Sequence, residues 1–282
     1  TVMAHIEEPF AEKRFHKHFL GGWLGFGDYK AEIEGVKDHW VMDPGIVTGM
    51  LKKGKFQEIK NHTGWLYSYS QRFRSYPILD IEANSQTINQ LQSVIDNLTK
   101  NSTSRSAQCI TWDPRWDHND GQMKFKNEKG DIEKAIFDDY HAPCLQRLWW
   151  RIFQTKEGYT LNLNTDWRSR CHLKAFPQNI FGVTEAFMEP IRADLEQSLK
   201  APVKIGRYLD KSDSLHIYGH YLDTRRQGLD AEAYLQDVFK IAGGQSIEER
   251  LILPNTPMYE IMQEDIKNEY QLRKSNPDYG RG

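Results

Sequence analysis

The chain has 282 residues, of which 39% are hydrophobic and 12% aromatic, so it is long and apolar enough to bury the core of a globular protein. Its formal net charge of -2 argues against a general basic surface for nucleic acid, although it permits a local basic pocket for a small anion. The three cysteines are too widely spaced for a disulfide framework or a zinc site, so we expect free thiols and no metal. No apolar run approaches the roughly 20 residues of a membrane span and no signal-peptide pattern is present, so we expect a cytoplasmic protein with no membrane partner.

Several segments in the first half of the chain have recognisable patterns. A helix is predicted over residues 28–39, and the glycine-rich stretch LGGWLGFGDY that leads into it is interpreted as a turn region. Apolar residues recur at helical spacing over residues 88–98, which predicts an amphipathic helix with Ser85 as its N-cap. The segment SAQCITWDP is rich in β-formers and ends in Asp-Pro, so it is predicted to be a buried strand.

The second half of the chain alternates predicted strands and helices. The runs over residues 145–154 and from Tyr159 flank the turn-like sequence TKEG and predict an antiparallel hairpin. A helix is predicted over residues 182–199, with a kink at Pro190. Further strands are predicted at VKIGRYL and SLHIYG, and further helices over residues 231–242 and 258–274. Because the chain has no repeat or linker, these elements predict one α+β domain over residues 1–282.

A thiol stands at an unusual place in the stretch HAPCLQRLWW. Cys144 follows a proline directly and precedes a run that is predicted to be a buried strand. A cysteine thiolate is a strong nucleophile, and nearby cationic side chains favour it over the thiol. Such a cysteine is therefore either a nucleophile or a buried structural thiol.

Two further stretches combine groups that suit a phosphorylated, planar ligand. In DWRSRCHLKAFPQNI, Arg168 and Ser169 offer donors to phosphate oxygens, and Asn179 offers an amide that can both donate to and accept from the edge of a base. In DSLHIYGHYLD, His216 and Tyr218 are predicted to lie on one face of a strand, where both can reach one sugar hydroxyl.

The order of these motifs resembles the thymidylate synthase superfamily. APC, then RSRC and FPQNI, then DSLHIYGHYLD match the family's Pro-Cys nucleophile, its Arg-Ser phosphate site with a nearby Asn, and its His-x-Tyr pair. Upstream, YSQRFRSYP resembles the family's Tyr-Gly-x-Gln-x-Arg segment, and NSQTINQLQSVIDNLTKNSTSRSAQCITWDP resembles its helix, Ser-Arg turn and Trp-ending strand. The resemblance runs from about Tyr67 to Asp223, and HIEEPF and Pro-Cys-Leu-Gln point to the divergent archaeal-type or antibiotic-pathway branch.

This resemblance implies a fold, an activity and an assembly. The fold is a large, mostly antiparallel, bent sheet flanked by helices. The activity is that of a one-carbon transferase that methylates C5 of a pyrimidine nucleotide, with dUMP as the leading substrate and 5,10-methylenetetrahydrofolate as co-substrate. The assembly is a homodimer that shares its sites between subunits. Two alternatives stay open: folate-dependent C5 hydroxymethylation of dUMP, UMP or a cytidine nucleotide, and a catalytically silent nucleotide-binding homologue.

The resemblance also implies roles for individual residues. Cys144 would add its thiolate to C6 of the base, which makes C5 nucleophilic and divides a difficult substitution into easier steps. The other implied roles are phosphate binding by Arg168 and Ser169, phosphate binding across the dimer by Arg105, base reading by Asn179, sugar contacts by His216 and Tyr218, and a place near the C5 proton for Tyr69. Structural alternatives are a solvated charge for Arg105, a core aromatic for Tyr69, and the polar face of a strand for the His-x-Tyr pair.

Three positions depart from the family pattern. Cys171 stands where the family usually has an aspartate that contacts the pterin ring, so this cofactor-binding position has altered chemistry. Ser106 replaces the second partner-subunit arginine, and Leu145 replaces the histidine after the nucleophile. The family's glutamate that organises water and protons near the base matches no motif here, and Glu32 and Glu34 are the candidates.

Overall fold

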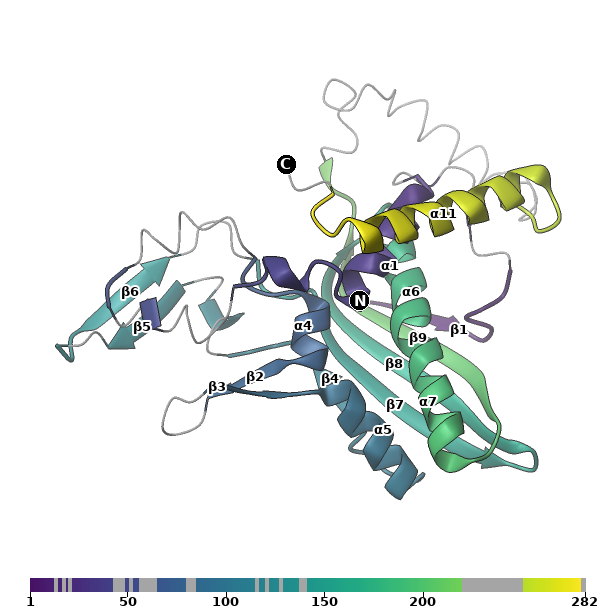
Figure 1. The fold of residues 1–282 in the computed structure, drawn as a ribbon, viewed down its shortest axis with the longest axis horizontal. Coiled ribbons are helices and arrows are strands. Elements are labelled where there is room, and N and C mark those ends of the chain that lie inside the picture. The colour runs from purple at the N-terminus through teal and green to yellow at the C-terminus, as the bar shows by residue number, and fades with distance from the viewer. Residues whose placement is uncertain are drawn as a thin grey trace.

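A computed structural model describes most of the chain as helices packed on a sheet (Figure 1). The residues described are 1–12, 15–16, 19, 22–42, 49–50, 53–55, 65–79, 85–114, 117–119, 122–126, 129–136, 141–219 and 251–279. The helix predicted over residues 231–242 lies outside them. Within the described ranges, no helix is both long enough and apolar enough to span a bilayer.

A five-stranded sheet in the order β1-β9-β8-β7-β4 forms the centre of the fold. Its strands are β1 (Val2–Ile6), β4 (Gln108–Ile110), β7 (Leu145–Thr155), β8 (Gly158–Cys171) and β9 (Val203–His216). Only β8 and β9 run parallel, whereas the other neighbours in this sheet are antiparallel. The prediction of an α+β protein with a large, mostly antiparallel sheet is therefore confirmed. Two separate hairpins consist of β2 (Tyr76–Leu79) with β3 (Ser85–Ile88), and β5 (Gln122–Lys126) with β6 (Ile132–Ile136).

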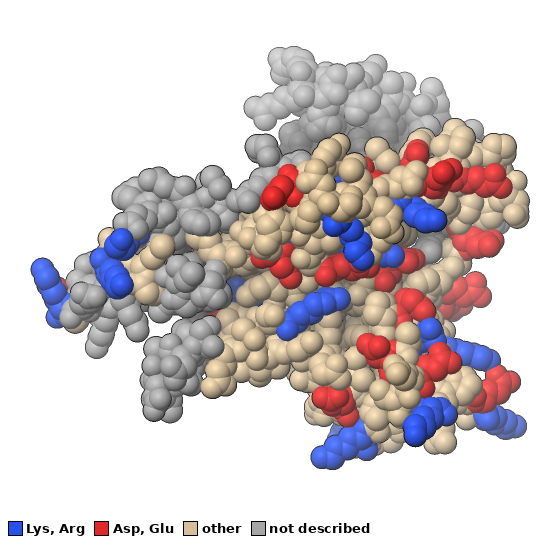
Figure 2. Space-filling model, viewed as in Figure 1, with Lys and Arg blue, Asp and Glu red and all other residues tan. Residues whose placement is uncertain are grey.

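The helices gather on one side of this sheet. Figure 1 shows α5, α6 and α7 lying across one face of the sheet and α11 lying against α1. The helical segments are α1 (Leu24–Glu34), η1 (Asp38–Trp40), α4 (Tyr69–Arg74), α5 (Gln90–Lys100), η2 (Asp117–Asn119), α6 (Ala175–Val183), the π-helical turn η3 (Thr184–Met188), α7 (Glu189–Leu199) and α11 (Pro257–Ser275). On the face seen in Figure 2, Lys and Arg are interspersed with Asp and Glu, as suits a chain of small net charge.

The strand predictions hold with one change. The hairpin around TKEG is confirmed, since β7 and β8 are joined by a tight turn that ends at Gly158 with φ 143°. The segments VKIGRYL and SLHIYG, predicted as two strands, form the single strand β9, which ends at His216. Tyr218 therefore lies beyond the strand, and the prediction that it shares a strand face with His216 is wrong.

Three helix boundaries differ from the prediction for local reasons. The turn predicted for the glycine-rich stretch is limited to Gly22 and Trp23 among the described residues, because α1 begins at Leu24; the helix ends at Glu34, before Gly35, whose φ of 103° stops a helix. Helix α5 begins after Asn89, whose side chain accepts from the Gln92 N–H, so Ser85 is not the N-cap. The helix predicted from residue 182 begins at residue 175, and a π-helical turn precedes Pro190, which has no N–H for the preceding turn.

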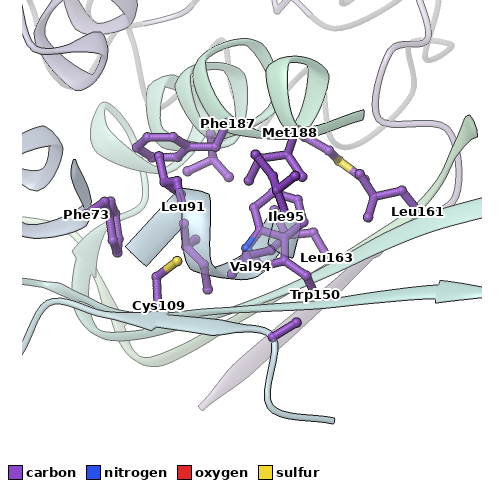
Figure 3. Packing of buried hydrophobic residues seen from close by; sticks show 14 of the residues in the cluster. Phe73, Leu91, Val94, Ile95, Cys109, Trp150, Leu161, Leu163, Phe187 and Met188 are labelled. Atoms are coloured by element: carbon purple, nitrogen blue, oxygen red, sulfur yellow. The ribbon is translucent and has the colours of Figure 1, made fainter. Parts of the chain in front are cut away.

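The hydrophobic core lies between the helices and the sheet. Figure 3 shows side chains of α5, such as Leu91 and Val94, meeting Trp150 of β7 and Leu163 of β8. Side chains along β8 alternate between buried and partly exposed from Leu161 to Trp167, as expected for a strand with one face on the core. This core fixes the ends of β7 and β8, where the predicted site residues lie.

Helices α1 and α6 pack against each other through two glycines. A side chain at Gly25 would collide with Gln178, and a Cβ at Gly182 would lie 2.6 Å from two ring carbons of Tyr29. Because both contacts advance in the same direction along the chain, the two helices run parallel. The glycines let α1, from the start of the chain, reach the sheet end that carries the site motifs.

We expect Leu98→Ala to lower the free energy of unfolding by about 2–5 kcal/mol, because Leu98 is fully buried under α7 and its loss leaves a cavity. Urea denaturation measures the change. Thr99→Ala, on the exposed face of the same helix, is the control and should change stability by less than about 0.5 kcal/mol. Equal effects of the two substitutions would contradict the packing described for α5.

Candidate functional site

Cys144 lies at the start of β7, next to an irregularity in the sheet. The register between β7 and β8 shifts between Leu145 and Arg147, so Gln146 forms a bulge. The Arg168 N–H donates to the Cys144 carbonyl at 2.9 Å, which keeps the cysteine attached to β8 on the other side of the bulge. Bulges beside sites redirect side chains, and this one leaves the Cys144 side chain half-buried rather than in the core.

Tyr69 fixes the backbone of the cysteine. Its hydroxyl oxygen accepts from the N–H groups of Cys144 and Leu145, at 3.1 and 3.2 Å. Burial raises the pKa of Tyr69 well above its ordinary value, and the nearby Cys144 adds to this effect. The phenol therefore stays neutral and keeps its own proton available for one donated hydrogen bond.

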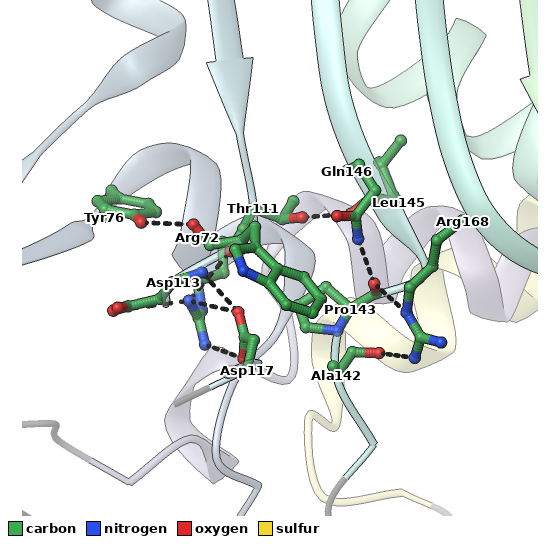
Figure 4. Close-up of polar contacts among 11 residues, drawn as sticks. Arg72, Tyr76, Thr111, Asp113, Asp117, Ala142, Pro143, Leu145, Gln146 and Arg168 are labelled. Carbon is green, nitrogen blue, oxygen red and sulfur yellow. Dashed lines mark hydrogen bonds and ion pairs between the residues drawn. The ribbon is translucent and has the colours of Figure 1, made fainter. Parts of the chain in front are cut away.

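Arg168 holds the loop before the cysteine, as Figure 4 shows. Its Nε donates to the Pro143 carbonyl at 3.0 Å and its Nη2 to the Ala142 carbonyl at 2.5 Å. These bonds place a positive charge close to the thiol and fix the direction from which the chain enters β7. Arg168, which the sequence predicts to bind phosphate, thus also positions the loop before Cys144, and the sequence did not reveal this second role.

Arg170 is buried and bound by a carboxylate. Both of its terminal nitrogens donate to Asp210, and Nη2 also donates to Ser212 Oγ at 2.6 Å. Its guanidinium lies 4.4 Å from the ring centre of Trp167 and 4.5 Å from that of Phe176. Asp210 additionally accepts from Tyr208 Oη at 2.6 Å, Thr165 Oγ1 at 3.0 Å and Trp167 Nε1 at 3.1 Å.

Arg168 and Arg170 oppose the effect of burial on the pKa of Cys144. Burial raises the pKa of Cys144, and the positive charges of Arg168 and then Arg170 oppose that rise. Burial dominates at Cys109, where it raises the pKa to about 12 although Trp150 and the charge of Arg74 oppose it. Of the three cysteines, only Cys144 is not fully buried.

Helix α1 brings a tyrosine and a carboxylate to the same region. The Tyr29 hydroxyl is buried and lies within electrostatic reach of Tyr69, Glu32 and Arg170 and beside the Asn179 amide. Asn179 is 6% exposed on α6. Two predicted site residues, Asn179 and Tyr69, thus lie close to Tyr29 of α1.

Glu32 and Glu34 point in different directions. Burial raises the pKa of Glu32, while Lys37, whose Nζ lies 2.9 Å from Glu32 Oε2, opposes the rise. Glu32 also acts electrostatically on Tyr69, so it faces the cysteine side. Glu34 accepts from the Tyr270 hydroxyl on α11 and faces away from this region. Glu32 is therefore the better candidate for the glutamate that the family places near the base.

The end of β8 pairs with the end of β9. Cys171 is buried and lies in register with His216, and the His172 N–H donates to the His216 carbonyl at 2.8 Å. His216 Nε2 is buried and has no hydrogen-bond partner among the described residues. The Tyr218 ring, 46% exposed, lies edge-on to His216 at 4.5 Å.

Arg105 is not brought to this region within one chain. It is exposed, and its carbonyl accepts from Trp149 Nε1, well along β7. At about 3.3 Å per strand residue, Trp149 is roughly 16 Å along the chain from Cys144. Ser169 is partly exposed beside Arg168, in register with Ser214. The backbone of Arg105 therefore lies well along β7 from Cys144 within one chain.

Sequence motifs did not single out three groups that lie around Tyr69 and Cys144, namely Tyr67, Arg72 beside Tyr67, and Tyr29. Tyr67 interacts electrostatically with the thiol, and the Arg72 guanidinium lies 5.3 Å from the Tyr67 ring. Arg72 itself is bound by Asp117 and the Thr111 carbonyl, as drawn in Figure 4. Tyr29, three residues before Glu32, is the third. Its only local signal is helical spacing with Glu32, which puts both on one face of α1.

Comparison with known proteins finds relatives that carry the name of the family that the motifs resemble. Proteins named "Putative thymidylate synthase" match this chain: that of Methanocaldococcus jannaschii is 30% identical over 152 residues, 54% of this chain and 55% of that protein, and that of Methanococcoides burtonii is 27% identical over 164 residues, 58% of each. The matches span little more than half the length of these relatives. They support the resemblance to the thymidylate synthase superfamily.

Family models and solved structures were compared with the chain as well. No family model matches the chain. The thermostable thymidylate synthase A from Bacillus subtilis superposes with a TM-score of 0.47 and 14% identity, over 83% of this chain and 69% of that structure.

We expect Arg168→Gln to shift alkylation of Cys144 by iodoacetamide to higher pH. The thiolate reacts, its formation is favoured by the arginine charge, and removing that charge raises the pKa of Cys144 further. The pH dependence of the rate, followed by mass spectrometry of the Cys144 peptide, measures the shift. Arg168→Lys, which keeps the charge, should shift it less, and Arg147→Gln, an exposed arginine paired with Asp166, should not shift it. An unchanged profile in Arg168→Gln would show that this charge does not act on the thiol.

Proposed function

We propose that the protein is a thymidylate synthase-like one-carbon transferase that activates C5 of a pyrimidine nucleotide through a covalent adduct with Cys144, with dUMP as the leading substrate. The observation that carries the proposal is the placement of Cys144. Its thiol is half-buried at a β-bulge, between two arginines that favour the thiolate and a tyrosine that fixes its backbone. Cys109, by contrast, is fully buried in the core, where the charge of one arginine, Arg74, acts on it.

The activation step follows from the chemistry of the thiolate. The Cys144 sulfur forms a bond to C6, and the electrons of the C5–C6 double bond move toward C5 and the oxygen on C4. C5 then takes up a proton from solvent or another electrophile. Loss of the original C5 proton returns the electrons, rebuilds the double bond and expels the thiolate. The protein gains a route to exchange at C5 without an oxidant or reductant.

The surrounding groups fit the two needs of this step. Asn179 offers an amide to the base, and its N–H can stabilise charge that develops on the C4 oxygen. Glu32, with a raised pKa and near Tyr69, can hold a proton close to the base. Tyr69 stays neutral, so we assign it the orientation of the cysteine backbone rather than removal of the C5 proton.

The ligand's phosphate and sugar have separate partners in the proposal. Arg168 and Ser169 would meet the phosphate, with Arg105 added from a second subunit of a homodimer. His216 would meet a sugar hydroxyl, since its Nε2 lacks a partner within the described part of the chain. Tyr218 would contact the same sugar from the segment beyond β9.

The one-carbon donor expected from the resemblance is 5,10-methylenetetrahydrofolate, and the residues fit it poorly at one position. Cys171 stands where the family has a pterin-binding carboxylate, and a thiol is a weak acceptor for ring N–H groups. It is also buried in register with His216. We therefore assign no step to the donor.

That same substitution favours C5 hydroxymethylation as the second candidate reaction. Delivery of a hydride requires a closely held donor, whereas attack by water requires only an open path and a base. After incubation with dUMP and methylenetetrahydrofolate, mass spectrometry separates the products, because the hydroxymethyl nucleotide is heavier than thymidylate by one oxygen atom. Dihydrofolate is expected to accompany methylation alone.

We expect Cys144→Ala to abolish tritium release from 5-tritiated dUMP and to leave dUMP binding within about threefold of wild type. The thiol supplies the covalent bond, whereas phosphate and sugar contacts supply the affinity of the ground state. Scintillation counting measures release and calorimetry measures binding. Cys171→Ala and Cys109→Ala are matched thiol controls and should retain release. Release from the Cys144 variant would rule out the covalent mechanism.

We expect an inactive Arg105→Ala protein mixed with inactive Cys144→Ala protein to regain activity after subunit exchange. Since Arg105 lies far from Cys144 within one chain, a hybrid dimer would contain one site with both wild-type residues. Tritium release from the mixture, up to about a quarter of the wild-type rate for random exchange, measures the rescue. A monomer by light scattering, or no rescue, would contradict a shared site.

A further inference from the structure

An asparagine alone does not choose between uracil and cytosine. Uracil presents an acceptor at position 4 and a donor at N3, whereas cytosine presents a donor and an acceptor at the same places. An amide has both functions and can turn over to suit either base. If Asn179 selects a uracil nucleotide, as the proposed function requires, something must fix the direction of its amide.

The structure places one candidate group beside that amide. The Tyr29 ring packs against the backbone of α6 at Gly182, where any side chain would strike ring carbons at 2.6 Å. Asn179 lies three residues before Gly182 and therefore on the same face of α6, toward α1. The ring is held by backbone on one side and by the core on the other, so its hydroxyl has a fixed place.

The hydroxyl has a reason to bind the amide in one direction. It is buried and falls short of full hydrogen-bond geometry with every described residue, but the Asn179 amide lies close enough to act on it as a hydrogen-bond donor, and such a group gains from completing that bond. Glu32, one helical turn further along α1, acts on it electrostatically, and a carboxylate attracts the phenol proton toward itself. The oxygen lone pairs then face away from Glu32, where they can accept from the Asn179 amide nitrogen.

We propose that Tyr29 is a positioning residue for base selection: its buried hydroxyl fixes the Asn179 amide, so that α6 presents its donor and acceptor in the order that uracil matches and cytosine does not. This inference rests on the proposed function, because it takes Asn179 as the residue that meets the base. It adds a group from α1, outside the motifs, to the determinants of specificity.

The test compares nucleotide binding by wild type and Tyr29→Phe, which removes the hydroxyl and keeps the ring over Gly182. Calorimetry gives dissociation constants for dUMP and dCMP. We expect wild type to prefer dUMP and Tyr29→Phe to reduce that preference by at least about tenfold, equivalent to about 1.4 kcal/mol. Gly182→Ala, which must displace the ring, should reduce it in the same direction. Asn179→Asp marks the limit, because a carboxyl group no longer presents an amide.

The control is Tyr270→Phe. It removes a hydroxyl of α11 that donates to Glu34, which lies on α1 as Tyr29 does but faces away from the site. It should keep the wild-type preference, and thermal melting should show both Phe variants folded. A reduction of less than about tenfold in Tyr29→Phe, or a wild type without preference, would overturn the inference. Tritium release separates the two proposals: selective dUMP binding without release contradicts the proposed activity and leaves Tyr29 in its role.

Discussion

The ion pair between Arg170 and Asp210 is the interaction on which the arrangement around Cys144 depends. Both side chains are almost fully buried, and removing one partner from such a pair typically costs about 3–5 kcal/mol because the other charge is left unpaired. Asp210 joins β9 to β8 through Thr165 and Trp167 as well as through the arginine. The pair therefore fixes a positive charge near the thiol and ties together the two parallel strands that present the site.

The two arginines of the RSRC motif have different duties. Arg168 is partly exposed and bonds to carbonyls of the loop before Cys144, so it can exchange those contacts for contacts with a ligand. Arg170 is surrounded by aromatic rings and a carboxylate and has no such freedom. The fixed charge of Arg170 can act steadily on the thiol, while Arg168 remains able to bind an anion. A single arginine could not do both.

The sequence predicted the parts of the fold whose signals are local. The β7–β8 hairpin and the strand after Cys144 follow from alternation and turn composition, and α5 follows from helical spacing. The contribution of α1 was missed, because its glycines resemble turn residues although Gly25 and Gly27 serve close helix packing instead. Tyr29 meets Asn179 across some 150 residues of chain, and no local periodicity reports such a contact.

The packing of α1 against α11 affects the order in which the site can form during synthesis. The backbone of α11 at Ile266 and Tyr270 approaches Gly27 so closely that no side chain fits there, and Arg273 of α11 lies 3.1 Å from Asp28. Helix α1, which carries Tyr29 and Glu32, is thus packed between α6 and the last helix described. During synthesis, the ribosome releases α1 early and α11 late, so the site cannot reach its final form until nearly the whole described chain has emerged.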